Sequence, residues 1–265
     1  MDLPLGRQVE YKDTLDPSLL FPIERTHARS KNGVLQPLPF SGVDLWRAFE
    51  LSWLGPSGVP EVALGTISYP AESPCIVESK SLKLFLNSFN NTEFNSAGEV
   101  QSVIASELSR CVGCSVVVEV VLPERWAKEG ISSPVGECID RTPLSGASHD
   151  WFVGEEKATE VLYTNLLRSL CPVTGQPDWG TMVVSYSGRK LNPAKLLNSV
   201  VEHRNFQGFH EECCEKYFVT LLKYLEPTTL SVGCFYTRRG GIDINPIRWL
   251  VGGESNIDYR RLHRQ

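Results

Sequence analysis

The chain has 265 residues, a formal net charge of −5 at pH 7, and a composition of 42% hydrophobic and 22% charged residues. This composition is typical of a globular protein that buries a substantial core. Residues 1–130 carry 11 basic and 16 acidic residues, and residues 131–265 carry 15 of each. The sequence thus has no basic stripe for a phosphate backbone, and we expect no direct nucleic-acid partner.

The sequence also lacks the signals of a membrane or secreted protein. No apolar stretch is long enough to span a bilayer, and the segment MDLPLGRQVEYKD has no basic-then-apolar signal pattern. We therefore expect a cytoplasmic protein without a membrane partner, whose eight cysteines are mostly reduced. Cys111 and Cys114 form a C-x-x-C pair, but no second pair lies at zinc-finger spacing, so we expect no metal site.

The first half of the chain is predicted to be a module at residues 1–130. A stretch rich in proline, glycine, serine and charge, about Pro123–Lys157, separates the two structured halves. EVALGTISYP, CIVES and CSVVVEVVLP are its predicted strands. SKSLKLFLNSF is a predicted helix, and a second helix should begin at Ser96, because Glu99 completes a capping box. The apolar helix positions expected in the core are Leu82, Phe85, Leu86, Phe89, Val100, Val103, Ile104 and Leu108.

The second half, residues 131–265, repeats this order. ATEVLYTNLL, GTMVVSYSG and IDINPIRWL are predicted strands, and LSVGCFYTRR alternates as a half-buried strand should. Asn192 and Pro193 open one helix, and a second, HEECCEKYFVTLLKYLEP, stops at Pro227. The positions expected in the core are Leu196, Leu197, Val200, Val201, Cys214, Tyr217, Phe218, Leu221, Leu222 and Leu225, and the six tryptophans are expected there too.

The order strand–strand–helix–helix–strand–strand, read twice, predicts an α+β protein built from two ββααββ modules. Each module would have an antiparallel sheet with helices on one face. The other face of the sheet is left for a partner, so closure by oligomerisation is expected.

Cys171 is the first candidate for chemistry. It follows a predicted strand, Gly175 and Pro177 then turn the chain, and Asp178 returns it toward the next strand. A thiolate is a nucleophile, and a nearby carboxyl can move its proton. The same spacing also fits a buried structural cysteine beside a turn aspartate.

The first of three further segments with candidate binding groups lies around Glu78. Glu78 is predicted to end a strand just before Ser79 and Lys80, where a carboxylate could accept the N–H groups of a guanine-like ring, and a hydroxyl, amides and a cation could hold a phosphate. A helix cap with solvated lysines is the alternative there.

His210 and Glu211 lie on the inward face of their helix, near its N-terminus, whereas Glu212 and Glu215 are expected to point more to the side. Two inward ionisable groups are costly unless something uses them, although they could simply cap the helix. The turn YTRRGGIDINP places Arg238 and Arg239 before two glycines, which suits a phosphate or an ordinary exposed hairpin turn.

Four motifs, ESKSLKLFLNSFN, CPVTGQPDWG, FHEECCEK and RRGGIDINP, occur in this order. Together they closely resemble the NADPH-dependent 7-cyano-7-deazaguanine reductases of queuosine biosynthesis, in the long two-module form. The resemblance covers essentially the whole chain, and the first two motifs are highly specific. It implies a tunnelling fold (T-fold), in which paired ββααββ modules build a barrel with active sites at module interfaces. It also implies a homodimer that reduces a nitrile to a primary amine with two NADPH.

The resemblance implies a role for each matching position. Cys171 would be the nucleophile that forms a thioimide, and Asp178 the proton-transfer residue. Glu78 and Glu211 would hold the deazaguanine edge, and His210 would also be a proton source. Val77, Ser79 and His210 would complete the substrate pocket, and NADPH would be held by Ser79, Lys80, Arg239 and Gly240.

Three other functions remain open from the residues alone. A pterin-forming cyclohydrolase would share the fold but would need a zinc site of cysteine and histidine. A module that only binds a purine-like ligand would keep Glu78 and Glu211 without using Cys171. The thiols could also have a redox role, such as protection of Cys171 in a disulfide.

Overall fold

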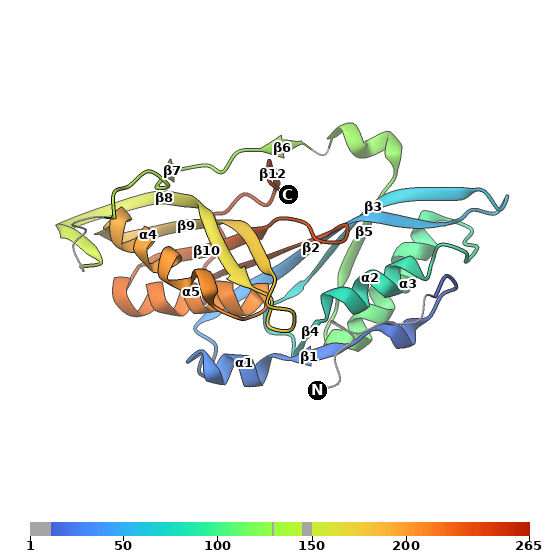
Figure 1. The fold of residues 1–265 in the computed structure, drawn as a ribbon, viewed down its shortest axis with the longest axis horizontal. Coiled ribbons are helices and arrows are strands. Elements are labelled where there is room, and N and C mark those ends of the chain that lie inside the picture. The colour runs from blue at the N-terminus through green and yellow to red at the C-terminus, as the bar shows by residue number, and fades with distance from the viewer. Residues whose placement is uncertain (1–11, 129, 145–149) are drawn as a thin grey trace. The chain divides into compact units, whose positions relative to one another are not determined.

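The computed structural model describes residues 12–128, 130–144 and 150–265 (Figure 1). The chain divides into two compact units. The described residues of the first unit fall within Met1–His27, Asp44–Gly130 and Arg238–Ile244; those of the second fall within Ala28–Val43, Ile131–Thr237 and Asn245–Gln265. Module boundaries at 1–130 and 131–265 stay a prediction.

Antiparallel strands form the sheet of the first unit. Its order is β5 (Val117–Val121), β3 (Pro60–Pro70) and β2 (Phe40–Leu54), with β3 and β5 in a register that pairs Leu64 with Val121. β1 (Pro22–Glu24) pairs with β4 (Cys75–Val77) in a separate two-stranded sheet. The predicted strand CIVES is thus the short β4, outside the main sheet, and the sequence analysis missed β2.

Two helices cover one face of β3 and β5 (Figure 1). They are α2 (Ser79–Asn87) and α3 (Ala97–Val112). The predicted helix start at Ser96 is confirmed, because Ser96 Oγ accepts the N–H of Glu99 at 3.2 Å. The return bond differs from the predicted capping box, since Glu99 Oε2 accepts the N–H of Asn95, one residue before the cap, at 2.9 Å. All the predicted apolar helix positions of this half are buried except Val103, which is half-buried. Trp46 and Trp53 of β2 join this core.

The second unit contains the longer strands. Its order is β11 (Ile242–Leu250), β10 (Thr229–Tyr236), β9 (Pro177–Leu191), β8 (Phe152–Leu170) and β7 (Glu137–Cys138), antiparallel except for β7 beside β8. α4 (Pro193–Glu202) and α5 (His210–Leu225) lie over one face of these strands (Figure 1). Asn192 caps α4 as predicted. The α+β class is therefore confirmed.

The remaining helices and strands are short. They are α1 (Arg25–Lys31), β6 (Ile131–Ser132), which pairs in parallel with β12 (Arg261–Leu262), and the 3₁₀ turns Pro17–Leu19, Pro123–Lys128 and His203–Asn205. None of the helices in the described ranges is long and apolar enough to cross a membrane.

β10 is buried on both faces, so the prediction of a half-buried strand is wrong. On the helical face, Cys214 of α5 lies with its sulfur 3.5 Å from the carbonyl oxygen of Val232. On the other face, Phe235 packs with Ile257 and Leu262, which come from the segment that follows β11. The chain itself therefore supplies the second cover for this strand.

Two other expectations about burial need correction. Val201 and Leu222 are half-buried, because they lie at the edges of the apolar faces of α4 and α5. Of the six tryptophans, Trp46 and Trp53 are in the core, whereas the others are half-buried or exposed. Trp151, for example, stacks on Tyr224 with ring centroids 5.1 Å apart.

A buried ion network crosses the second unit. Glu215 of α5 accepts hydrogen bonds from Arg29 Nη2 at 2.7 Å and from Arg248 Nη2 at 3.0 Å, and all three side chains are buried. Both guanidinium groups also lie over the Phe40 ring. The prediction that Glu215 points sideways is therefore wrong, since the two arginines satisfy its charge inside the core.

The neighbouring Glu212 is affected electrostatically by this arrangement. Burial, together with the charge of Glu215, raises the pKa of Glu212 from 4.5 to about 7, although Lys31 opposes the shift. Glu212 therefore retains a proton in the folded protein at pH values where the unfolded chain has released it.

Glu215→Ala should lower the free energy of unfolding by about 3–5 kcal/mol, because it leaves two buried guanidinium groups without their carboxylate. Urea denaturation would measure the loss. Glu156→Ala, which breaks the exposed pair between Glu156 and Lys190, is the matched control and should cost less than about 1 kcal/mol. Equal losses in the two variants would contradict a stabilising role for the buried network.

Glu212→Gln should change the pH dependence of stability. Between pH 4.5 and about 7 the folded protein binds the extra proton, so the wild type loses stability as the pH rises through this window. The variant lacks this loss, and its stability relative to wild type should rise from pH 5 to pH 8 by at most about 3 kcal/mol. Urea denaturation at the two pH values measures the difference; a constant difference would exclude the raised pKa.

Candidate functional site

The β8–β9 hairpin positions the thiol and the carboxyl of the cysteine motif. Cys171 directly follows β8, and Asp178 is the second residue of β9, in register with Ser169. The connecting turn is closed by the N–H of Cys171, which donates to the Gln176 carbonyl at 2.8 Å, and Gly175 takes the left-handed backbone that this turn requires (φ +68°). Both candidate side chains, Cys171 and Asp178, are buried at this end of the hairpin.

Backbone hydrogen bonds bring the start of α5 to the same end of the hairpin. The Leu170 N–H donates to the Phe206 carbonyl at 2.8 Å, and the Gly208 N–H donates to the Leu170 carbonyl at 3.2 Å. His210 then begins α5 with its Nε2 3.5 Å from Asp178 Oδ2. The structure therefore places a histidine and a carboxylate, 32 residues apart in the chain, in contact beside the Cys171 loop.

Glu211 follows His210 in the first turn of α5, and its side chain is 3% exposed. The partial positive charge of a helix N-terminus favours a carboxylate at this position. A buried carboxylate here can accept N–H groups of a ligand, which is the chemistry predicted for it.

Glu78 is the N-cap of α2 and is fully buried. Its Oε1 accepts the Lys80 N–H at 2.8 Å, and its Oε2 accepts the Ser81 N–H at 2.7 Å. The helix-cap alternative is thus part of its role. Oε1 also accepts the Ser79 hydroxyl at 3.4 Å, whereas Oε2 has a second lone pair that can accept a ring N–H. Val77, which precedes it, is buried at the end of β4.

The turn between β10 and β11 contains Arg239, Gly240 and Gly241. Gly240 and Gly241 have φ of +57° and +77°, and the Ile242 carbonyl accepts the Arg239 N–H at 2.8 Å. The Phe49 N–H of β2 donates to the Gly241 carbonyl at 2.8 Å, which holds this turn close to β2.

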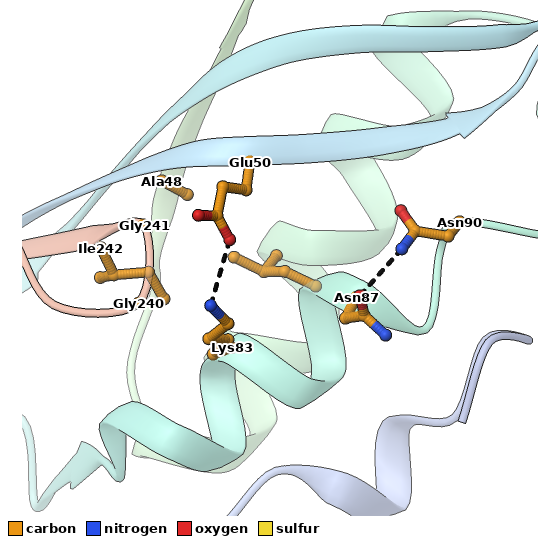
Figure 2. Close-up of a pocket in the computed structure, with 9 residues that line it drawn as sticks. Ala48, Glu50, Lys83, Asn87, Asn90, Gly240, Gly241 and Ile242 are labelled. Carbon is orange, nitrogen blue, oxygen red and sulfur yellow. Dashed lines mark hydrogen bonds and ion pairs between the residues drawn. The ribbon is translucent and has the colours of Figure 1, made fainter. Parts of the chain in front are cut away.

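A cavity of about 250 Å³ lies beside this turn in the first unit (Figure 2). Lys83 of α2 and Glu50 of β2 point toward each other across it, with Nζ and Oε2 3.1 Å apart, and both side chains are partly exposed. Asn87 and Asn90 line its other end. The sequence analysis did not single out Lys83; the signal was its position one helical turn after Lys80, on the same face of α2.

The predicted site residues fall into two sets. Val77, Glu78, Ser79, Lys80, Arg239 and Gly240 belong to the first unit, and Cys171, Asp178, His210 and Glu211 belong to the second. Within residues 12–128, 130–144 and 150–265, no group of three or more histidine, cysteine, aspartate or glutamate side chains is placed to hold a metal ion. The functional roles of all these residues stay predictions.

Comparison with known proteins gives consistent results along the chain. Residues 11–120 match the family described as nitrile reductase, 7-cyano-7-deazaguanine-reductase N-terminal, and residues 177–250 match the family described as QueF-like protein.

Curated relatives extend this similarity over nearly the full length. The NADPH-dependent 7-cyano-7-deazaguanine reductase of Desulfotalea psychrophila is 47% identical over 253 residues, which cover 93% of this chain and 92% of that protein. Proteins of the same name from Burkholderia mallei and Burkholderia thailandensis are 45% and 44% identical over 256 residues, with 92% of each chain covered. At this identity and coverage, the chain belongs to the family of NADPH-dependent 7-cyano-7-deazaguanine reductases.

Proposed function

We propose that this protein reduces the nitrile of 7-cyano-7-deazaguanine to a primary amine, giving 7-aminomethyl-7-deazaguanine for queuosine biosynthesis. Membership in the reductase family supports the reaction class. One observation, at the end of the β8–β9 hairpin, supports the assignment to residues. Cys171 and Asp178 are buried there, and His210 Nε2 lies 3.5 Å from the Asp178 carboxylate.

The first step is addition of the Cys171 thiol to the nitrile. A sulfur–carbon bond forms, one carbon–nitrogen π bond breaks, and its electron pair goes to the nitrogen. Asp178 transfers the thiol proton to that nitrogen, so the product is a neutral thioimide. The covalent bond converts an unreactive nitrile into a C=N group that can be reduced.

The reduction then releases the sulfur. NADPH, when bound, supplies hydride to the former nitrile carbon, two equivalents per turnover. After the first reduction the carbon–sulfur bond breaks as a C=N bond re-forms, and a proton from the nitrogen returns to Cys171 as its thiol. Each of the two reductions also needs one proton on the nitrogen; His210 supplies it, and its contact with Asp178 gives it a carboxylate from which it can recover that proton.

Two carboxylates are assigned to the deazaguanine ring. Glu78 and Glu211 accept its N–H groups, and both are buried, which strengthens such hydrogen bonds and makes the loss of one costly. Val77, Ser79 and His210 complete the substrate contacts.

Ser79, Lys80, Arg239 and Gly240 are assigned to NADPH. The residues fit such a ligand because the glycine turn leaves room that a Cβ would fill: a Cβ on Gly240 would lie 3.0 Å from Lys83 Cδ. Lys83 adds a cation beside this turn, suited to a cofactor phosphate, and its present partner, Glu50, is itself largely exposed and can release it.

A homodimer, a cytoplasmic location, modules at 1–130 and 131–265 and the absence of a direct nucleic-acid partner complete the proposal. The dimer is supported by β5, which stands at the end of the strand order and leaves an edge for another strand.

Cys171→Ala should abolish a covalent adduct. Intact mass of the protein mixed with 7-cyano-7-deazaguanine, without NADPH, should show one ligand mass on the wild type and none on the variant, and NADPH should then clear the adduct. Cys138→Ala, which removes an exposed thiol, is the control and should form the adduct normally. Reduction that survives in Cys171→Ala, or a wild type without adduct, would contradict the proposal; zinc-dependent activity would favour a cyclohydrolase.

Lys83→Met should raise the KM for NADPH roughly 10- to 100-fold, because a charge-assisted hydrogen bond contributes about 1.5–3 kcal/mol. Steady-state kinetics would measure it, and adduct formation without NADPH should be unchanged. Lys190→Met, which removes a lysine with a similar exposed glutamate partner, is the control and should leave the KM as in wild type. An unchanged KM in Lys83→Met would place the cofactor phosphates elsewhere.

A further inference from the structure

We propose that Tyr236 is a positioning residue for the reaction: it holds the His210 ring in the orientation that presents Nε2 to Asp178. The inference rests on the proposed function for the role of His210, whereas the geometry behind it belongs to the second unit alone. Nothing in the motif resemblance assigns a role to Tyr236, which lies just before the arginine–glycine motif.

The two rings are stacked face to face. Their centroids are 3.7 Å apart and their planes differ by 5°. Aromatic pairs usually prefer offset or edge-on arrangements at larger separations, so this close parallel contact restricts rotation of the imidazole about its Cβ–Cγ bond. Tyr236 is fully buried.

The imidazole needs such support because it has few polar contacts. Nε2 is 3.5 Å from Asp178 Oδ2, which is long for a hydrogen bond. Nδ1 is buried, and the described residues offer it no hydrogen-bond partner. Functional histidines are commonly oriented by a hydrogen bond at the second nitrogen. Here that bond is missing within the described chain, so the Tyr236 ring takes its place.

Tyr236 itself is firmly held in the sheet. It ends β10 in register with Gly180 of β9, and the next residue, Thr237, donates its N–H to the Trp179 carbonyl at 2.8 Å. Gly180 permits this close pairing, since a Cβ there would lie 2.7 Å from the Phe235 carbonyl oxygen. Asp178 is two residues before Gly180 on the same strand, so the stacking face and the carboxylate are fixed by one pair of strands.

The face of the Tyr236 ring positions His210, and the Tyr236 hydroxyl does not take part in this contact. Burial, with the Cys213 and Cys234 thiols nearby, raises the pKa of Tyr236 well above its usual value, so the phenol stays neutral. The hydroxyl faces Ser169 and Cys213. Removing it should therefore leave the stack intact, which gives the inference a conservative test.

A double-mutant cycle tests whether Tyr236 acts through His210. Tyr236→Leu should slow NADPH-dependent clearing of the Cys171 adduct about 10- to 100-fold, because small misplacements of catalytic groups have effects of this size. Tyr236→Phe should clear the adduct at the wild-type rate. In a His210→Ala background, Tyr236→Leu should cause no further loss. The same loss in both backgrounds, or equal losses in Tyr236→Phe and Tyr236→Leu, would overturn the inference.

Phe235→Leu is the matched control for the structural cost of losing a buried aromatic residue. It removes a ring from the same strand, on the face away from α5, and should lower stability while leaving adduct clearing as in wild type. If it slows clearing as much as Tyr236→Leu does, the effect is one of packing and the inference fails.

A measurement on the wild type avoids any folding defect of the variants. Proton NMR should show the His210 ring C–H signals displaced upfield, and farther than those of His203, whose ring is tilted by 57° from Tyr217 at a centroid distance of 5.5 Å. His210→Ala identifies the signals by their disappearance, and Tyr236→Phe should keep them upfield. Undisplaced signals would overturn the stack. A displaced signal in a protein that forms no Cys171 adduct would refute the proposed function and leave the ring contact standing.

Discussion

Two backbone hydrogen bonds at Leu170 position the candidate site residues of the second unit. They join the end of β8 to residues 206–208, just ahead of α5. The cysteine loop begins at the next residue of the chain, and His210 begins its helix two residues after Gly208. One strand end therefore fixes both the thiol loop and the helix N-terminus, and the contact between His210 and Asp178 follows from it. Backbone bonds tolerate many side chains, which leaves the side chains at this strand end available for chemistry.

Helix N-termini recur where the assigned binding groups lie. Glu78 caps α2 and Glu211 lies in the first turn of α5, and each is buried. The partial positive charge at a helix start stabilises a carboxylate that would otherwise be costly to bury. The two sites solve the problem differently, because Glu78 accepts two N–H groups of its own helix, whereas the start of α5 has no side-chain cap.

The sequence predicted those features that depend on neighbours in the chain. The Ser96 cap, the Asn192 cap and the helical faces of α2 and α5 all follow from spacing over a few residues. β2 was missed because its buried face includes Gly42 and Asp44, which hide the apolar alternation; Asp44 is buried through its ion pair with Arg25. The family motifs identified the candidate residues. Their spacing along the chain did not predict which of them contact one another in the fold.

Other errors in the sequence predictions involve residues distant in the chain. Glu215 is turned inward by Arg29 and Arg248, which lie 186 and 33 residues away. β10 is covered on its second face by Ile257 and Leu262, which no local pattern connects to it. The stacking of His210 on Tyr236 is of the same kind, because only the sheet register brings the two rings together.

The double duty of Glu78 has a consequence for how such an enzyme could change. The carboxylate assigned to the substrate ring also starts the helix that carries Ser79, Lys80 and Lys83, which are the residues assigned to the cofactor. A lineage that replaced this carboxylate to accept a different heterocycle would also fray the helix to which the cofactor contacts are assigned. If these assignments hold, a change of substrate at Glu78 would require a compensating change in how α2 begins.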